Sequence, residues 1–322
     1  MTHPDAIQPI PANPGPWCEN AVFAAYDSKV GVSVWAHWGR IPGAAHIWEG
    51  YLGVFLPAGG LLVSRAFGPA PRDDEASTGA LSFRCLEPGQ RWHVEFDGMA
   101  RPASQAELIG GPLVDGPVER LVIDLEFEAV HEIYGGGANQ QEWATAHFDQ
   151  GGRVAGTVAH GGETYAISSG GFRDHSYGPR DYSTVVGDTW CTAVFPSGRA
   201  LLGVEVWQAE GPPYRQGFTF DGTTLRPATD MRLPRLSAAD GAPHNFTMTL
   251  TTEAGTTEFS VEQQASMALT FGRPVGLVAG ARTDDPELPV ITEGPARITW
   301  DGEVTDGWIE KSMRVTEFAS GR

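Results

Sequence analysis

Apolar and polar side chains alternate along most of this chain. Between residues 121 and 130, Ile123, Leu125 and Phe127 occupy every second position, and acidic residues stand between them. Because successive side chains of a β-strand point to opposite faces of a sheet, this spacing predicts a strand with one buried face. Similar runs predict further strands at 30–38, 48–56, 60–67, 80–86, 91–97, 153–159, 163–168, 186–195, 199–208, 214–220, 246–252, 256–262, 296–300 and 304–317.

Turn residues separate these runs. Asp97, Asp221 and Asp301 are each followed by glycine between two alternating segments, and Asp-Gly in that position is a strong hairpin signal. Helices are predicted only at 138–147 and 262–269, so strands do not alternate with helices as they do in parallel α/β sheets. The pattern predicts an all-β protein built of antiparallel barrels or sandwiches.

The length of the chain indicates two domains. It has 322 residues, and a domain typically takes roughly 150. Each half contains a run of predicted hairpins, and the pattern breaks near 170–185. We therefore predict an N-terminal domain at 17–182 and a C-terminal domain at 183–322. Residues 1–16 contain five prolines, which exclude a helix and favour an extended segment over the surface.

Charge excludes some classes of partner. The formal net charge is -18 and the sequence pI is about 4.8. Binding to a nucleic acid or to an anionic membrane surface depends on Lys and Arg, so neither is expected. No stretch approaches the ~18 apolar residues of a membrane helix. The segment that begins at Met1 lacks the basic and apolar regions of a signal peptide. We expect a cytoplasmic protein without a membrane span, and a homodimer stays open.

The spacing of the cysteines and histidines indicates neither a metal site nor a disulfide framework. Cys18, Cys85 and Cys191 are far apart and odd in number, which indicates neither a disulfide framework nor a zinc knuckle. His131 is followed by glutamate but lacks the second histidine of a zinc-protease motif. No other histidines have metal-ligand spacing. We therefore predict that the protein uses no metal.

The densest polar segment reads Gly-Gly-Phe-Arg-Asp-His-Ser-Tyr-Gly-Pro-Arg-Asp and ends at Asp181. In a structural interpretation, Asp174 and Asp181 pair with Arg173 and Arg180 and fix a junction loop. In a functional interpretation, Asp174 and His175 form a proton donor and acceptor where two barrels meet. Burial would raise the pKa of the carboxyl group, whereas a neighbouring arginine would lower it, so both interpretations stay open.

This segment resembles the Arg-Asp-His-Ser-Trp-Gly-x-Arg-Asp signature of the tandem lipocalin-like proteins related to hydroxyneurosporene synthase (carotenoid 1,2-hydratase) and the AttH-like proteins. Fungal decalin-forming cyclases share that layout. Tyr177 stands where tryptophan is usual. The resemblance extends to Pro-Trp-Cys-Glu-Asn from Pro16, to His-Phe-Asp-Gln-Gly-Gly-Arg from His147, and to Gly-Trp-Ile-Glu ending at Glu310.

The resemblance implies two lipocalin-like barrels with an apolar pocket near their interface and no metal or organic cofactor. It also implies isoprenoid or polyketide substrates, on which water is added to or removed from an alkene, or a ring is closed. Protonating an alkene requires a desolvated acid, and aromatic faces stabilise the cation that follows. The chain has 10 tryptophans, several of them in predicted strands, which fits such a pocket.

Candidate residues follow from both lines of reasoning. Asp174 and His175 are the first candidates for proton transfer. Glu310 is a candidate second acid, because it shares one side of a predicted strand with Trp308. The supporting residues are Arg173, Arg180, Asp181 and His147. The substrate-contacting residues are Tyr177, Trp190, Trp308, Trp143 and Glu205, with Trp143 and His147 on one face of the helix predicted at 138–147.

The prediction is a cofactor-independent acid–base enzyme that acts on a hydrophobic, terpenoid-like small molecule. Hydration or dehydration of a carbon–carbon double bond is the first choice, followed by isomerisation or cyclisation. The main alternative is a lipocalin-like binding protein for an apolar ligand, in which the charged motif is structural. A carbohydrate-active β-sandwich would require paired carboxylates across an open cleft.

Overall fold

The computed structural model describes residues 5–135, 144–271 and 276–318. These residues are mostly β-strand and divide into two compact units. The first unit comprises Met1–Pro102, Asp115–Tyr182 and Pro274–Gly276. The second comprises Ala103–Val114, Ser183–Arg273 and Leu277–Arg322. The described residues contain no helix that is long and apolar enough to cross a membrane.

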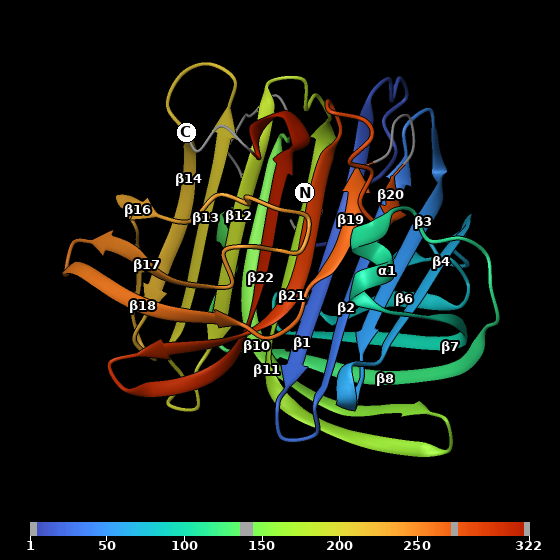
Figure 1. Ribbon diagram of the computed structural model, residues 1–322, viewed down its shortest axis with the longest axis horizontal. Coiled ribbons are helices and arrows are strands. Elements are labelled where there is room, and N and C mark those ends of the chain that lie inside the picture. Colours follow the sequence, from blue (N-terminus) through green and yellow to red (C-terminus); the bar gives the residue numbers. More distant parts are fainter. Residues whose placement is uncertain (1–4, 136–143, 272–275, 319–322) are drawn as a thin grey trace. The chain divides into compact units, whose positions relative to one another are not determined.

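The first unit is a closed antiparallel barrel (Figure 1). Its strands pair in the order β4-β3-β2-β1-β11-β10-β8-β7, and β4 also pairs with β7, which closes a ring of eight. Strands β5 and β6 continue the sheet beyond β7, and β9 pairs with β10. The strands are β1 (Trp17–Asp27), β2 (Val32–Ile41), β3 (Ala44–Phe55), β4 (Leu61–Pro69), β5 (Glu75–Ser77), β6 (Leu81–Glu87), β7 (Arg91–Ala103), β8 (Glu119–Ala129), β9 (Tyr134–Gly135), β10 (Ala146–His160) and β11 (Glu163–Pro179).

Apolar side chains fill the interior of this barrel. The rings of Trp38 and Phe83 stack with centroids 5.0 Å apart, and those of Phe83 and Trp92 with centroids 4.4 Å apart. The strand predicted at 121–130 is β8, and its alternate residues Ile123 and Phe127 are fully buried in the same cluster. The period-two pattern therefore identified both the strand and its inward face.

The second unit is a curled antiparallel sheet. Its order is β15-β14-β13-β12-β22-β21-β18-β17-β16, and β19 pairs with both β20 and β21. Its core holds the buried side chains of Cys191, Phe195, Met248, Phe259 and Ile309. The strands are β12 (Val185–Val194), β13 (Ala200–Gln208), β14 (Tyr214–Phe220), β15 (Leu225–Pro227), β16 (Asp230–Arg232), β17 (Asn245–Thr252), β18 (Gly255–Gln263), β19 (Met267–Phe271), β20 (Leu277–Ala279), β21 (Pro289–Trp300) and β22 (Glu303–Arg314).

Both predicted helices are wrong where the structure describes them. Ala146 and His147 begin β10, and residues 136–143 of the first predicted helix lie outside the described residues. In the second, Gln263 ends β18 and Met267 begins β19. Pairing with neighbouring strands overrides the helix propensity of glutamine and alanine in these short segments.

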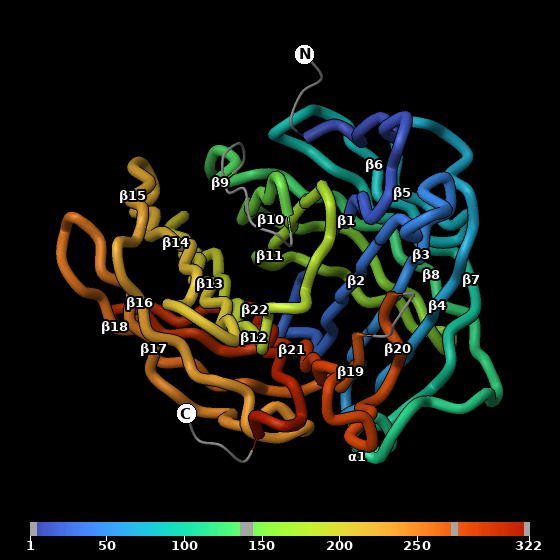
Figure 2. Tube along the Cα trace, turned by 90° about the horizontal axis from the view of Figure 1, so that it is seen from above, coloured from blue at the N-terminus to red at the C-terminus, as the bar shows by residue number. Residues whose placement is uncertain are grey.

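One α-helix escaped the sequence analysis. Helix α1 (Gln105–Gly110) follows β7 along the chain, yet it lies beside β19 and β20 (Figures 1 and 2). The Ser104 hydroxyl caps it by accepting the Glu107 N–H at 3.1 Å. The Ala281 N–H donates to the Leu108 carbonyl at 2.7 Å and links the helix to the segment after β20. The spacing of Ser104 and Glu107 is a capping-box pattern, which was the available signal.

Candidate functional site

The charged motif lies in β11, and its neighbouring residues point in opposite directions. Arg173 and His175 face the barrel interior, because they pair with Phe23 and Ala21 of the core-facing side of β1. Asp174 points to the outer face of the barrel and pairs with Val22. The structure therefore does not bring Asp174 and His175 together, since residues adjacent in a strand alternate between faces.

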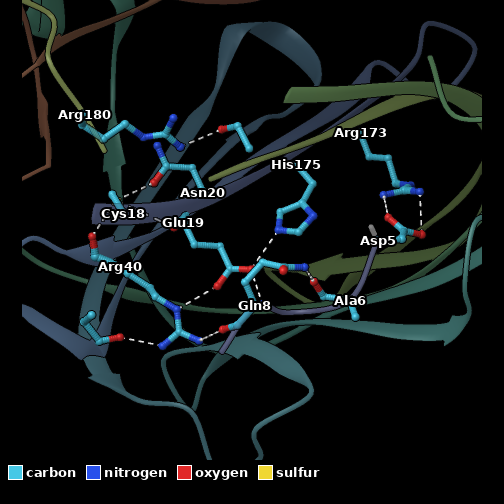
Figure 3. Close-up of polar contacts among 12 residues, drawn as sticks. Asp5, Ala6, Gln8, Cys18, Glu19, Asn20, Arg40, Arg173, His175 and Arg180 are labelled. Atoms are coloured by element: carbon cyan, nitrogen blue, oxygen red, sulfur yellow. Dashed lines mark hydrogen bonds and ion pairs between the residues drawn. The ribbon is translucent and has the colours of Figure 1, made fainter. Parts of the chain in front are cut away.

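Arg173 is buried inside the barrel with an unexpected partner. It donates to the two Asp5 carboxylate oxygens at 2.6 and 2.9 Å (Figure 3). It also donates to Gln150 Oε1 at 2.6 and 3.0 Å. Asp5 also accepts the Gly89 N–H at 2.7 Å and the Trp92 indole N–H at 3.2 Å. The expectation that residues 1–16 run over the surface is wrong at Asp5, because the Arg173 charge requires a buried carboxylate.

His175 joins a second ion-paired group in the interior. Its Nε2 donates to Glu19 Oε1 at 2.9 Å, and Arg40 Nε donates to Glu19 Oε2 at 2.8 Å (Figure 3). The Gln8 N–H also donates to Glu19 at 2.7 Å, and the Arg40 guanidinium lies over the Trp48 ring, 4.4 Å from its centroid. Because Glu19 already holds three donors, this group acts as a structural attachment for the N-terminal segment.

The outer face of the same strands carries a row of mostly polar side chains. Five residues on five adjacent strands lie directly opposite one another, each on the strand next to the last: Asp149 of β10, Asp174 of β11, Val22 of β1, His37 of β2 and Tyr51 of β3. Direct partners have Cβ atoms about 4.5–5.5 Å apart, so these side chains form one continuous line. A second line beside it runs through His147, Ser176, Asn20, Gly39 and Glu49.

Asp174 and His147 form a hydrogen-bonded pair on this face. His147 Nε2 donates to Asp174 Oδ2 at 3.0 Å and lies 4.0 Å from Asp149 Oδ1. The exposed fractions of the side chains are 5% for His147, 1% for Asp149 and 14% for Asp174. Among the residues that the structure describes, Asp174 Oδ1 has no hydrogen-bond partner. The pair thus has one fixed hydrogen bond and one carboxylate oxygen available to a ligand.

The surroundings raise the pKa of His147. Burial lowers the pKa of His147, but the negative charge of Asp149 and the hydrogen bond and charge of Asp174 outweigh it. The net result is a pKa above the ordinary histidine value, although the Arg180 charge opposes it. A buried imidazolium between two carboxylates can donate a proton and recover it, which is the property that a general acid requires.

His37, on the same face, has a pKa shifted in the opposite direction from that of His147. Burial lowers its pKa to about 4, and the Asp174 charge offsets this only in part. His37 is therefore neutral near pH 7. Two histidines with separated pKa values beside one carboxylate are an arrangement typical of acid–base sites.

The remaining motif residues lie at the end of β11. Arg180 Nη2 donates to the Ser176 hydroxyl at 2.9 Å, and Asp181 is exposed. Tyr177 is half-buried, with its ring centroid 5.7 Å from that of His175. Burial raises the pKa of Tyr177. Arg173 and Arg180 were predicted to support Asp174 and His175. Arg173 instead bonds Asp5 and Gln150, and Arg180 bonds Ser176.

The second unit places its predicted residues on two faces. Trp308 and Glu310 share one face of β22 as predicted, and Trp190 lies directly opposite Glu310 on β12. This is the face opposite Ile309, which packs in the core. The Trp308 indole donates to Glu293 at 2.6 Å. Glu310 and Trp190 are half-buried.

Glu205 and Trp143 complete the predicted set. Glu205 is buried and accepts from Arg215 Nε at 3.0 Å, and its second oxygen accepts the Leu233 N–H at 3.2 Å. Its carboxylate is therefore engaged in local contacts. Trp143 lies outside the described residues. No group of three or more metal-ligating side chains occurs in the described ranges 5–135, 144–271 and 276–318.

Sequence reasoning missed the partners of the motif. Asp149, His37 and Tyr51 join Asp174 only through the register of five neighbouring strands. Asp5 reaches Arg173 across 168 positions of sequence. The one usable signal was Asp149, two residues after His147, because that spacing places both side chains on the same face of a strand.

Comparison with known proteins sets this geometry in a family. A family model described as a domain of unknown function (DUF7064) matches residues 5–315. The chain belongs to this family. No curated protein matches it. The DUF7064 description names no activity, so the family assignment covers the whole described chain without fixing a reaction.

Solved structures show the fold that this DUF7064 protein shares. A protein described as AttH from Nitrosomonas europaea has a TM-score of 0.62 at 15% identity, over 92% of this chain and 91% of that one. CghA with Sch210972 has a TM-score of 0.60 at 10% identity, over 93% and 88%. Kievitone hydratase from Nectria haematococca has a TM-score of 0.55 at 10% identity, over 97% and 94%. At these identities the likeness concerns the fold, and it confirms the lipocalin-like all-β class.

Proposed function

We propose that this protein is an acid–base enzyme that acts on a hydrophobic small molecule, with His147 and Asp174 as its proton-transfer pair. The hydrogen bond of 3.0 Å between them carries the proposal, because it joins a buried histidine with a raised pKa to a carboxylate whose second oxygen has no hydrogen-bond partner among the described residues. Asp174 keeps the role that the motif suggested. His175 is replaced by His147, which lies on the same face as Asp174.

The proposed reaction is hydration or dehydration of a carbon–carbon double bond. His147 donates its proton to one alkene carbon, and water adds to the other carbon. The proton that the added water loses returns to the His147–Asp174 pair, so the protein ends in its starting state. Isomerisation follows the same route if a substrate proton is removed instead, and cyclisation follows if a second double bond attacks the cation.

Two further observations support this class of reaction. One solved structure with this fold is named a hydratase, and another holds the organic molecule Sch210972. In the second unit, Glu310 is half-buried on a face with Trp190 and Trp308. We retain Glu310 as a proposed second acid, with the two tryptophans as apolar contacts for the substrate.

The test is a search for proton transfer to carbon. The protein is incubated in deuterated water with a panel of terpenoid alkenes and of alkenes conjugated to aryl ketones, and the products are analysed by mass spectrometry. Hydration adds the mass of one water, whereas isomerisation or cyclisation adds only deuterium. Asp174→Asn and His147→Gln should each lower turnover at least about a hundredfold, which is typical of a lost general acid or base.

A second histidine–aspartate pair supplies the control. His93 Nε2 lies 2.9 Å from Asp124 Oδ1, and the Asp124 side chain is 69% exposed. Asp124→Asn removes a comparable contact and should keep wild-type turnover. If Asp174→Asn also turns over at the wild-type rate, the pair is not catalytic. If the wild type binds panel members and transforms none, the non-catalytic binding protein is the better account.

A further inference from the structure

Three aromatic side chains on the outer face of the first unit hold polar atoms that are buried and unpaired. The Trp35 ring stacks on His37 at 6.1 Å between centroids and meets Tyr51 edge-on at 5.7 Å. Trp35 is 2% exposed and Tyr51 is 0% exposed. Within the part of the chain that the structure describes, Trp35 Nε1, His37 Nδ1 and the Tyr51 hydroxyl have no hydrogen-bond partner.

Such a cluster is unusual for a folded protein. More than about 90% of buried polar groups are hydrogen-bonded, and each unpaired one costs about 1–3 kcal/mol. Two other buried tryptophans have a partner: the Trp92 indole donates to Asp5 at 3.2 Å, and the Trp308 indole to Glu293 at 2.6 Å. Three unpaired groups in one contacting cluster therefore indicate a polar ligand atom at this place.

The chemistry of the three groups defines that atom. An indole N–H is a donor only. Burial raises the pKa of Tyr51, so its hydroxyl keeps its proton and can donate. His37 is neutral and offers either a donor or an acceptor at Nδ1. Two fixed donors converge best on an oxygen that accepts two hydrogen bonds, such as a carbonyl or hydroxyl oxygen.

Nearby charge favours a neutral ligand over an anion, because the charge of Asp174 acts on His37 more strongly than the opposing charge of Arg180. Arg65 Nη2 lies 2.5 Å from Glu49 Oε1, so the cation beside Tyr51 is already neutralised. Asp174 lies in the same cross-strand row as His37 and Tyr51, and its negative charge would repel a carboxylate. The rings themselves supply apolar faces on which a flat, conjugated group can pack.

We propose that Trp35 and Tyr51 form an oxygen-binding subsite, which takes a neutral carbonyl or hydroxyl oxygen of a conjugated or aromatic substrate. This inference rests on the proposed function, because it places the oxygen relative to Asp174. His37 and Asp174 are separated by two strand spacings, roughly 10 Å between backbones. The substrate is thus an oxygenated molecule whose oxygen lies several bonds from the carbon that receives the proton, and not a pure hydrocarbon.

The test compares two probes of the same shape. 2-Acetylnaphthalene carries a carbonyl oxygen where 2-ethylnaphthalene carries a methylene group. Titration calorimetry on the wild type should show that the acetyl probe binds about five- to tenfold more tightly, as expected for one or two hydrogen bonds. Trp35→Phe and Tyr51→Phe should each lower that ratio about threefold or more and leave the affinity for the ethyl probe nearly unchanged.

Tyr165→Phe is the matched control, because Tyr165 packs against the apolar core cluster of the same unit. It should keep the wild-type ratio. If one tested variant fails to fold, as judged from its melting curve, the other carries the comparison. Equal affinity of the wild type for both probes, binding of neither probe, or an unchanged ratio in Trp35→Phe and Tyr51→Phe each overturn the subsite and favour an ordered water as the partner.

Asp174→Asn separates this proposal from the reaction. It should abolish turnover and still prefer the acetyl probe, since the subsite does not use the Asp174 carboxylate. If Asp174→Asn keeps both the probe preference and the wild-type turnover, the proposed reaction is refuted and the subsite proposal stands. If Asp174→Asn loses turnover and the wild type shows no probe preference, only the subsite proposal is refuted.

Discussion

His147 is the residue whose protonation state decides the chemistry on the outer face of the first unit. Asp149 and Asp174 raise its pKa above the ordinary value of 6.5, against the effect of burial. We predict that an NMR titration finds His147 charged at a pH where an ordinary histidine is neutral. Asp149→Asn and Asp174→Asn should each lower its pKa. A wild-type His147 that titrates below 6.5 would contradict the arrangement.

The sign of the linked stability follows from that shift. A group with a raised pKa stabilises the fold fully below its unfolded pKa, and this stabilisation is lost as the pH rises through the folded pKa. Turnover should fall over the same range, because the acid form of His147 disappears. A pH–rate profile of the wild type tests this, and its basic limb should shift to lower pH in Asp149→Asn.

His131 should respond to pH in the opposite direction. It is buried, its Nε2 accepts the Gly151 N–H at 2.9 Å, and its Nδ1 donates to the Glu132 carbonyl at 2.7 Å. Burial lowers its pKa to about 4, so protonation favours the unfolded state. We predict that His131 contributes a loss of stability as the pH falls from about 6.5 to about 4. In urea melts, His131→Asn should weaken this acid sensitivity, and an unchanged slope would refute the assignment.

The partner of Asp174 could not be predicted from the sequence. The motif drew attention to Asp174 but suggested His175 as its partner, because the two are adjacent in the chain. Strand alternation separates them, and the actual partner, His147, is 27 positions away. A further clue to the pair was the resemblance, which included both segments.

At the scale of elements, strands were predictable because alternation reports burial of one face. The register between strands was not, because it depends on how side chains of several strands pack together. The row from Asp149 to Tyr51 exists only in that register. Short segments with mixed patterns, such as 262–269, were assigned to a helix because propensity was the only signal there.

The pairing of β8 with β10 depends on a glycine. Gly156 has a φ of +144°, and a Cβ at that position would lie 2.0 Å from the Asp124 carbonyl oxygen. We predict that Gly156→Ala destabilises the protein by at least about 2 kcal/mol, because backbone cannot move aside as a flexible side chain can. Chemical denaturation measures this.

Gly110 is the control for that substitution. It lies in α1 and has no positive φ, and a Cβ added there would meet no atom within 4 Å. Gly110→Ala should be neutral or slightly stabilising, since alanine favours a helix. Equal losses in both variants would mean that the close approach at Gly156 relaxes easily.

At the scale of the whole molecule, the first unit depends on a contact between distant segments. Asp5 neutralises Arg173, which is 1% exposed and lies over the Trp92 ring at 4.7 Å. We predict that Asp5→Asn lowers the free energy of unfolding by about 3–5 kcal/mol, because it leaves a buried cation without its anion. Thermal and denaturant melts test this.

The exposed pair of Arg91 and Glu126 is the comparison, with its atoms 3.0 Å apart. Glu126→Gln should change the melting temperature little, because solvent screens that pair. A loss in Asp5→Asn no larger than in Glu126→Gln would show that Arg173 finds other partners inside the barrel.

The pairing of β1 with β11 has a consequence for synthesis on the ribosome. Trp17 faces Pro179, so β1 leaves the exit tunnel well before β11, its neighbour on that side. Asp5 and Glu19 likewise emerge long before Arg173 and His175. The nascent chain therefore carries these carboxylates in water until β11 has been translated, and ring closure comes as one of the last events for this unit.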